Sequence, residues 1–300
     1  MTSETLIVDR PPAPGAVLLA GLKTLAKSAP KAPTLPEVRL VRPDLAIEGA
    51  PLAEYRRLCG FGEAQGVPPV YPHLLAFPLH LELMMRRDFP YPLAGTVHIA
   101  NRIVQHRAIG AGDRLTVSAA FGGFRSHPRG QAFTILAEAQ QGGTTIWRSE
   151  SVYLRRGARA ALGAPVTSLS DGDAAITETD IENVPRTVAP GYARLSGDRN
   201  PIHMSWLGAR LFGFKRPIAH GMWTKARALA RVLPAAPVDQ VAIDVAFRAP
   251  ILLPGRIMHF ADPSETDTAF AVRDGTGERL HLIGRLGRDL FFAGYHAQHP

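Results

Sequence analysis

The stretch Leu195-Ser-Gly-Asp-Arg-Asn-Pro-Ile-His203 gathers a carboxylate, an amide and an imidazole around one proline. Pro201 suits the first turn of a helix, and Asn200 directly before it is a favoured N-cap. We therefore expect Asp198 in the approach loop and His203 in the first helical turn. Residues five apart in a regular helix point about 140° apart, but a turn lets both side chains reach one small space. Spacing alone leaves two interpretations open, a polar turn that starts a helix or a general acid–base pair.

A second polar segment, Pro217-Ile-Ala-His-Gly-Met222, leads directly into a stretch with apolar residues at helical spacing. Backbone N–H groups near Gly221 are then expected to be unpaired at a helix N-terminus, where partial positive charge collects. Such donors bind an oxyanion, and glycine lets a substrate approach the backbone closely. An acid–base pair beside an oxyanion site fits thioester chemistry. The alternative is structural: Gly221 relieves crowding and His220 caps the helix.

The sequence indicates two similar halves. Three segments of the first half match three segments of the second, in the same order and at similar spacing. The matched pairs are Tyr55–Phe61 with Tyr192–Asp198, Tyr71–Leu83 with Ile218–Ala230, and Val97–Val104 with Val241–Phe247. This order predicts a duplicated domain.

Each half shows the same succession of a polar turn, a helix and several short β-like segments separated by turn signals. One helix against an antiparallel sheet, twice over, predicts an α+β fold. The segments expected to form the sheet are 97–104, 114–121, 132–140 and 144–153 in the first half and 242–249, 256–261, 268–272 and 280–286 in the second. The expected organisation is a peripheral N-terminal arm at 1–36 with room for one short helix, a first repeat at 37–156, a linker at 157–172 and a second repeat at 173–300.

The composition predicts a soluble globular protein of a reducing compartment, with the cytoplasm as the expected location. A chain of 300 residues, 46% of them hydrophobic, can bury a large core. No apolar run approaches the roughly 20 residues that cross a bilayer, so we expect no membrane span, and the N-terminus has no convincing secretory cleavage site. The single cysteine, Cys59, excludes an intrachain disulfide.

The net charge of +8 does not indicate nucleic-acid binding. The basic residues are scattered, with the densest cluster at 155–159, and no basic tail or zinc-finger spacing accompanies them. A ligand with a few phosphates, or an acidic carrier protein, satisfies the same charge. Arg210, Lys215 and Arg216 lie near the polar turn in sequence and are candidate phosphate-binding residues, with a solvated basic face as the alternative.

The run Tyr192–His203, with Ala209 further on and Pro217–Gly221 downstream, resembles the signature of the MaoC-like dehydratases, the (R)-specific enoyl-CoA hydratases. The likeness extends from about residue 176 to the C-terminus, and the first half matches the inactive repeat of two-domain members weakly. The resemblance implies a double hot-dog fold, in which a curved antiparallel sheet wraps each long helix. It also implies reversible syn hydration of trans-2-enoyl thioesters, of coenzyme A or an acyl-carrier protein, to (R)-3-hydroxyacyl thioesters in fatty-acid metabolism, without metal or redox cofactor.

The resemblance assigns roles at the matching positions of this sequence. Asp198 and His203 match the catalytic pair that activates water and protonates the α-carbon. Asn200 matches the residue that orients the water or hydroxyl, and Gly221 matches the main-chain donor to the thioester oxygen. His220 is a candidate substrate contact, with a structural role at the helix start as the alternative.

The first half lacks this set of residues. Phe61 stands where the second half has Asp198, and residues 62–69 contain no histidine. We therefore predict no active site in the first half, but a scaffold whose apolar residues within 74–84 line an acyl tunnel; core packing explains the same residues. Pro78 in that run is expected to break or kink the helix.

Two other functions stay open. A hot-dog thioesterase would use a carboxylate and a helix N-terminus to cleave the thioester, although the D-x-N-P-x-H run argues against it. An acyl-thioester binding module without catalytic activity is the other alternative. A double hot dog supplies within one chain the pairing that single hot dogs obtain by dimerising, so the resemblance implies a pseudo-dimer and leaves a homodimer open.

Overall fold

The computed structural model describes residues 4–12, 30, 32–47, 49–93, 95–158 and 161–288. Their strands form one sheet of eleven in the order β1-β2-β4-β5-β6-β3-β8-β11-β10-β9-β7. The strands are β1 (Glu4–Ile7), β2 (Val38–Ala46), β3 (Thr96–Gln105), β4 (Arg114–His127), β5 (Gly130–Gln141), β6 (Thr144–Arg156), β7 (Glu178–Val184), β8 (Val241–Phe247), β9 (Gly255–Pro263), β10 (Asp267–Asp274) and β11 (Leu280–Gly287). The helices are α2 (Gly49–Cys59), α3 (Tyr71–Met85), α4 (Val188–Ser196), α5 (Pro201–Met204), α6 (Trp206–Leu211) and α7 (Gly221–Val232), with short 3₁₀ turns at Glu63–Gln65 and Asp171–Asp173.

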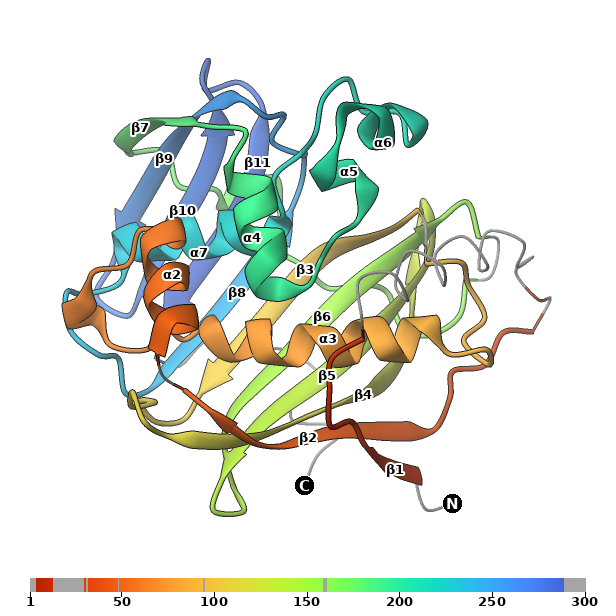
Figure 1. The fold of residues 1–300 in the computed structure, drawn as a ribbon. Helices are drawn as coiled ribbons and strands as arrows, with labels where there is room; N and C mark the ends of the chain where they lie inside the picture. Colours follow the sequence, from red (N-terminus) through yellow and green to blue (C-terminus); the bar gives the residue numbers. More distant parts are fainter. Residues whose placement is uncertain are drawn as a thin grey trace.

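The sheet confirms the duplication. The order β2-β4-β5-β6-β3 in the first half is matched by β7-β9-β10-β11-β8 in the second, and the halves meet where β3 pairs antiparallel with β8. Each half places one long helix, α3 or α7, against its curved sheet, while α2 and α4 occupy equivalent places before them (Figure 1). The fold is therefore the double hot dog of the α+β class that the resemblance implied.

The predicted meanders of antiparallel strands are confirmed. The strands that the sequence did not predict lie at or next to the edges of the sheet. Strands β2 and β7 lie toward opposite ends of the sheet and were not predicted. Strand β7, sequence ETDIENV, is mostly exposed and carries three acidic residues, so it shows little of the alternation that marks a half-buried strand. Strand β1 lies in the segment expected to be a peripheral arm, and it pairs parallel with β2 of the first repeat.

The predicted break at Pro78 is wrong, because α3 runs without interruption from Tyr71 to Met85 (Figure 1). A proline inside a helix removes one hydrogen bond and costs about 3 kcal/mol. Helix α3 is buried on most of its surface, which outweighs that cost. The Arg42 guanidinium also donates to the Leu75 carbonyl at 3.2 Å, next to the turn that the proline disturbs.

Two other expected segments are only partly described. The short helix expected in the N-terminal arm lies mainly outside the described residues. Of the expected linker, residues 161–172 follow the first repeat closely: the Leu162 N–H donates to Gln131 Oε1 at 2.8 Å, and Pro165 forms a bridge with Ser126. In the described part of the chain, no helix combines the length and apolar character of a membrane span.

A buried polar cluster joins the two halves beneath α7. Lys225 is fully buried, and its Nζ donates to the Asn101 side-chain oxygen at 2.6 Å and the Asn101 carbonyl at 3.1 Å. Burial lowers the pKa of Lys225 well below its usual range. Next to it, Arg102 of β3 pairs with its register partner Asp244 of β8 at 3.2 Å. These contacts hold the two repeats in one register.

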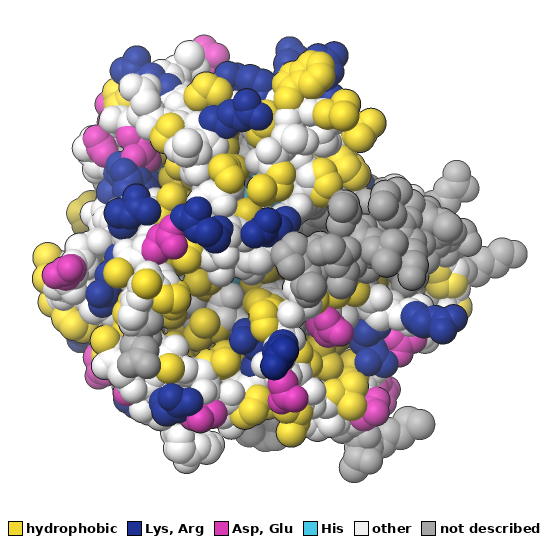
Figure 2. Space-filling model, in the orientation of Figure 1, with side chains coloured by type: hydrophobic (Ala, Val, Ile, Leu, Met, Phe, Trp, Pro, Cys, Tyr) yellow, Lys and Arg dark blue, Asp and Glu magenta, His cyan; other side chains and the backbone are white. Residues whose placement is uncertain are grey.

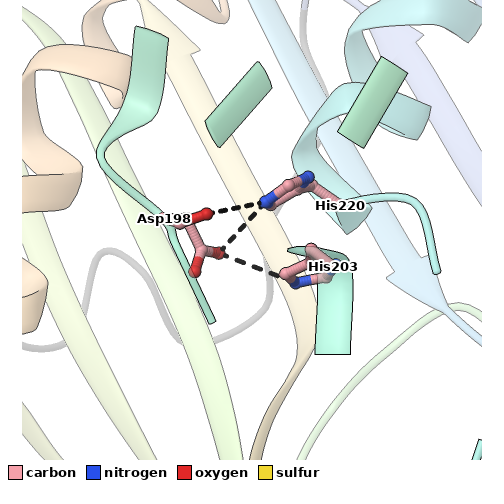
Figure 3. Close-up of side chains that lie close together, drawn as sticks. All are labelled: Asp198, His203 and His220. Carbon is pink, nitrogen blue, oxygen red and sulfur yellow. Dashed lines mark hydrogen bonds and ion pairs between the residues drawn. The ribbon is translucent and has the colours of Figure 1, made fainter. Parts of the chain in front are cut away.

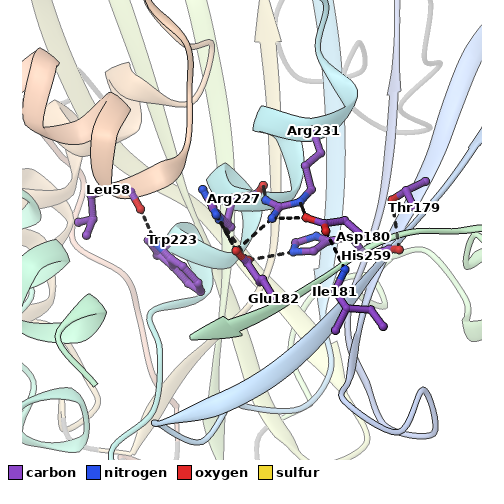
Figure 4. A network of polar contacts seen from close by, with 9 residues as sticks. All are labelled: Leu58, Thr179, Asp180, Ile181, Glu182, Trp223, Arg227, Arg231 and His259. Atoms are coloured by element: carbon purple, nitrogen blue, oxygen red, sulfur yellow. Dashed lines mark hydrogen bonds and ion pairs between the residues drawn. The ribbon is translucent and has the colours of Figure 1, made fainter. Parts of the chain in front are cut away.

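A second polar network fixes edge strand β7 to helix α7 (Figure 4). Glu182 accepts three hydrogen bonds from Arg227, at 2.6, 2.9 and 3.1 Å, and lies 3.0 Å from both Arg231 and the Nε2 atom of His259. Burial alone would raise the pKa of Glu182, but hydrogen bonds from His259 and Arg227 and the nearby positive charges hold it well below its usual range. The ionised carboxylate therefore stabilises the fold.

Replacing Glu182 by Gln is expected to lower the free energy of unfolding at pH 7 by about 3 kcal/mol, because charged partners lose their shared carboxylate. A depressed folded pKa contributes stability above the unfolded value near about 4.3, and loses it as the pH falls toward the folded value. The difference between E182Q and wild type should thus shrink below about pH 4. Urea titrations at several pH values measure it, with exposed Glu178→Gln on the same strand as a control that should change stability by less than about 0.5 kcal/mol.

Candidate active site

The turn predicted from LSGDRNPIH forms as expected. Helix α4 ends at Ser196, and Gly197 adopts the left-handed conformation (φ 79°) that glycine tolerates. The Asn200 side chain accepts a hydrogen bond from Ile202 N at 3.3 Å and so caps α5, in which Pro201 is the first residue. Asp198 Oδ1 accepts from Asn200 N at 3.3 Å, which leaves Oδ2 directed away from the turn. The capping residues are what place the acid and the imidazole together.

Asp198 and His203 lie close enough for both to bond the same water molecule. Asp198 Oδ2 lies 3.9 Å from His203 Nε2, too far for a direct hydrogen bond (Figure 3). His203 Nδ1 lies 2.8 Å from the Ile218 carbonyl, which can only accept, so Nδ1 carries the proton of the neutral ring. The Nε2 atom then presents a lone pair, and both groups facing the gap are hydrogen-bond acceptors.

His220 is the third member of this cluster, and the sequence did not reveal how it acts. Its Nε2 atom donates to the Asp198 carbonyl at 3.0 Å and lies 3.9 Å from Oδ2 (Figure 3). Its ring stacks on that of His203 with centroids 3.7 Å apart. Burial, together with the neighbouring His203, lowers the pKa of His220 to about 3, so its imidazole stays neutral. His220 occupies the N-cap position of α7 but makes no side-chain capping bond there.

Gly221 begins α7 with an available N–H. Among the described residues, no hydrogen bond uses this N–H as a donor. A Cβ at this position would lie 3.2 Å from the Phe247 ring, so the space beside the backbone is narrow and suits glycine. The helix N-terminus adds partial positive charge at the same point.

All five of these residues line one cavity of about 230 Å³ between the halves. The second half contributes Asp198, Asn200, His203, His220 and Gly221. The first half contributes part of the opposite wall, including His73, Phe77, Leu81, Met84, His98 and Tyr153. Only some of the apolar residues expected to line a tunnel along α3 do so. Phe77, Leu81 and Met84 line the cavity, whereas Leu79 and Leu83 are fully buried in the core.

The three candidate phosphate-binding residues lie outside the cavity wall. Arg210, Lys215 and Arg216 are exposed, Arg210 stacks over Trp206, and Arg216 donates to the Pro254 carbonyl. The basic residues that do line the cavity are Arg156 and Arg248. Lysine and arginine are otherwise spread over the visible face rather than gathered into one patch (Figure 2).

The same three side chains also have the donor set of a cation site. The ligand atoms of Asp198, His203 and His220 lie within 4.8 Å of one another. However, His220 uses its Nε2–H to bond the Asp198 carbonyl, and its ring stacks nearly parallel on His203, 23° from coplanar. A cation would have to break that hydrogen bond and turn the rings toward one point. The observed arrangement suits a water molecule better.

Comparisons of sequence and of structure both find similarity to MaoC-like dehydratases. Residues 170–278 match the MaoC-like domain family. A curated relative, 3-hydroxyacyl-thioester dehydratase X of Mycobacterium tuberculosis, is 31% identical over 242 residues, covering 78% of this chain and 86% of the relative.

Two solved structures from Mycobacterium tuberculosis extend the comparison to both repeats. HtdX superposes with a TM-score of 0.72 at 27% identity, over 83% of this chain and 98% of that one. A conserved protein described as a double hot-dog fold superposes with a TM-score of 0.52 at 14% identity, over 82% and 93% of the two chains, and shares the fold. Because the identity of 31% spans most of both proteins, this chain belongs to the MaoC-like dehydratase family.

Proposed function

We propose that this protein interconverts trans-2-enoyl and (R)-3-hydroxyacyl thioesters of fatty-acid metabolism by adding and removing water. The observation that carries the proposal is the 3.9 Å gap between Asp198 Oδ2 and His203 Nε2, beside an available N–H at Gly221. The sequence relative is named for dehydration of 3-hydroxyacyl thioesters, which is the same reaction in reverse. The (R) configuration follows the family resemblance.

The two acceptors can hold one water by both of its protons. With Asp198 ionised and His203 Nε2 unprotonated, each accepts one O–H, and a water lone pair is left for carbon 3 of the substrate. Imidazole is the stronger base of the two at neutral pH, so His203 takes the proton as the oxygen bonds to carbon 3. Asp198 holds the remaining O–H, and Asn200 at the end of the turn orients the same oxygen.

The developing negative charge moves to the thioester oxygen. The Gly221 N–H and the N-terminus of α7 stabilise that charge. His203 then returns its proton to carbon 2 from the side on which the oxygen entered, which makes the addition syn. Atoms balance, since water supplies the hydroxyl at carbon 3 and the hydrogen at carbon 2. Dehydration reverses these steps.

His220 serves as a positioning residue in this scheme. Its hydrogen bond fixes the backbone of Asp198, and its neutral ring packs against His203 without adding charge. The acyl chain lies along Phe77, Leu81 and Met84 of α3, whose apolar side chains face the same cavity. The first repeat therefore takes no part in the proton transfers but forms the acyl wall.

The thioester handle is coenzyme A or the phosphopantetheine arm of an acyl-carrier protein. Arg156 and Arg248 are the arginines that would bind its phosphates, since both line the same cavity as Asp198 and His203. The single cysteine, buried in α2, favours a reducing compartment, and we place the reaction in the cytoplasm. The two repeats already pair through β3 and β8, so the site needs no second copy.

Incubation with crotonyl-CoA and longer enoyl-CoA thioesters tests the proposal and separates it from a thioesterase. We expect loss of the enoyl absorbance without release of free thiol, and formation of the (R)-3-hydroxyacyl product on a chiral column. Thiol release at the rate of substrate loss would identify a thioesterase instead. Binding without either change would indicate a non-catalytic module.

A further inference from the structure

A cluster of three histidines and a tyrosine lies in the first repeat, at the end of the cavity wall formed by α3. His73 and His80 belong to α3, His98 to β3 and Tyr153 to β6. The His98 ring stacks on Tyr153 with centroids 4.6 Å apart, and His73 lies 6.0 Å from His98 and 5.2 Å from His80. The proposed reaction uses none of these side chains.

The cluster contains several hydrogen-bonding nitrogens without partners. His80 Nδ1 pairs with the Tyr153 hydroxyl at 3.0 Å. Among the described residues, however, neither nitrogen of His73 has a partner, and the Nε2 atoms of His80 and His98 have none. His73 is only 1% exposed. Leaving such groups unpaired in a folded core is unfavourable, and native structures satisfy nearly all of them.

These imidazoles are neutral. Burial lowers the pKa of His80 and of His98 to about 3, and it holds the pKa of His73 well below its usual range. A neutral imidazole offers one donor and one acceptor. The cluster can therefore give and accept hydrogen bonds to an uncharged oxygen, whereas a charged ligand would have to lose its hydration in an enclosed space.

The cluster lies on the path of the acyl chain. His73, His98 and Tyr153 line the same cavity as Asp198 and His203. Phe247 connects the two regions, because its ring lies next to Gly221 on one side and 5.1 Å from the His98 ring on the other. A chain that starts at the Gly221 N–H and enters the first repeat passes Phe247 and then meets the histidines.

We propose that His73, His98 and Tyr153 form a binding site for a hydroxyl or carbonyl oxygen carried on the acyl chain beyond the reacting carbons. The proposal rests on the proposed function for the position of the thioester. It assigns to the enzyme a preference for oxygenated acyl chains over plain alkyl chains. A site whose buried polar groups bond a substrate oxygen discriminates against the analogue that lacks it, because those groups are then left unpaired.

Binding of saturated acyl-CoA thioesters, measured by calorimetry, tests the site without depending on turnover. One ligand is a plain medium-length chain, and the others carry one hydroxyl or keto group at successive carbons beyond carbon 3. We expect one oxygenated position to bind about tenfold or more tightly than the plain chain, which is the value of one good hydrogen bond to a buried partner. His73→Leu and His98→Phe should each reduce this preference to about twofold or less.

A matched variant and a stability measurement test whether the histidine changes act only by altering the shape of the cavity or the stability of the fold. Ile251→Val changes a buried apolar side chain that lines the same cavity outside α3 and should leave the preference for oxygen intact. Thermal unfolding of His73→Leu should occur at the wild-type temperature or above, since the change removes two unpaired nitrogens.

Two results would overturn the site. Equal binding of plain and oxygenated chains by the wild-type protein would do so, as would a preference that survives both histidine changes. A lower unfolding temperature of His73→Leu with unchanged preference would show that the histidine is structural. Failure of the proposed function is distinguishable from failure of this site. The former would appear as an absence of crotonyl-CoA hydration, whereas the comparison of plain and oxygenated chains measures binding alone.

Discussion

Replacing Asp198 by Asn is expected to lower kcat/KM for enoyl-CoA hydration by about three orders of magnitude, within the range that general acid–base groups contribute. The amide has nearly the same shape and can still accept the Asn200 N–H that organises the turn. It cannot carry the negative charge that polarises the shared water, and its NH₂ group can face His203 as a competing donor. Initial rates of enoyl absorbance loss measure the effect, and far-ultraviolet circular dichroism checks the fold.

Asp274→Asn is the matched control for that change. Asp274 Oδ1 also accepts the N–H of the residue two positions on, Thr276, and so organises a turn in the same way, and Asp274 is not among the described residues that line the cavity. It should retain wild-type activity. If Asp198→Asn kept more than about a tenth of wild-type kcat/KM, Asp198 would have no part in proton transfer.

Much of this site could be predicted because its decisive geometry is local. The left-handed glycine, the Asn200 cap and the proline at the first helical position follow one another within five residues. Capping preferences and fixed backbone angles therefore determine where Asp198 and His203 point. The strands with clear alternation or long apolar runs could be predicted for the same reason, because the order of neighbouring residues alone indicates a strand.

The parts that sequence reasoning missed depend on contacts between distant segments. The hydrogen bond from His220 to the Asp198 carbonyl joins residues in different elements, and no local rule predicts it. The candidate phosphate-binding residues Arg210, Lys215 and Arg216 are close to the turn in sequence, yet the basic residues at the cavity wall are Arg156, at the end of β6, and Arg248, directly after β8. The local cost of Pro78 favours a break in the helix, whereas the burial of α3 on most sides keeps the helix continuous.

The two repeats contribute different residues to one cavity. His73 of the first repeat corresponds in position to His220 of the second, since each precedes the long helix or lies in its first turn. Phe61 stands at the position of Asp198, and among the described residues neither nitrogen of His73 has a hydrogen-bond partner. The second half contributes Asp198, His203 and His220 to the cavity, whereas the first half contributes an imidazole and apolar side chains of α3.

Replacing His203 by Asn is expected to lower kcat by about three orders of magnitude while changing KM by less than about fivefold. The Asn side-chain N–H can take the place of Nδ1–H and donate to the Ile218 carbonyl, so the turn keeps its anchor. What disappears is the Nε2 lone pair that faces Asp198 across the 3.9 Å gap. Steady-state kinetics with crotonyl-CoA separate the two parameters.

His281→Asn is the control that makes the His203 result specific. His281 also lines the cavity, and its Nδ1 atom also lies 3.0 Å from a carbonyl, that of Ala249, so the same substitution removes a similar ring from a similar setting. In the described structure no carboxylate forms an ion pair with it, and Asp274 acts on it only from a greater distance, so its kcat should fall by less than about tenfold. Comparable losses in both variants would mean that cavity shape, rather than a base at Nε2, accounts for the effect. A loss confined to His203→Asn assigns the proton transfer to the one imidazole whose lone pair the turn directs at Asp198.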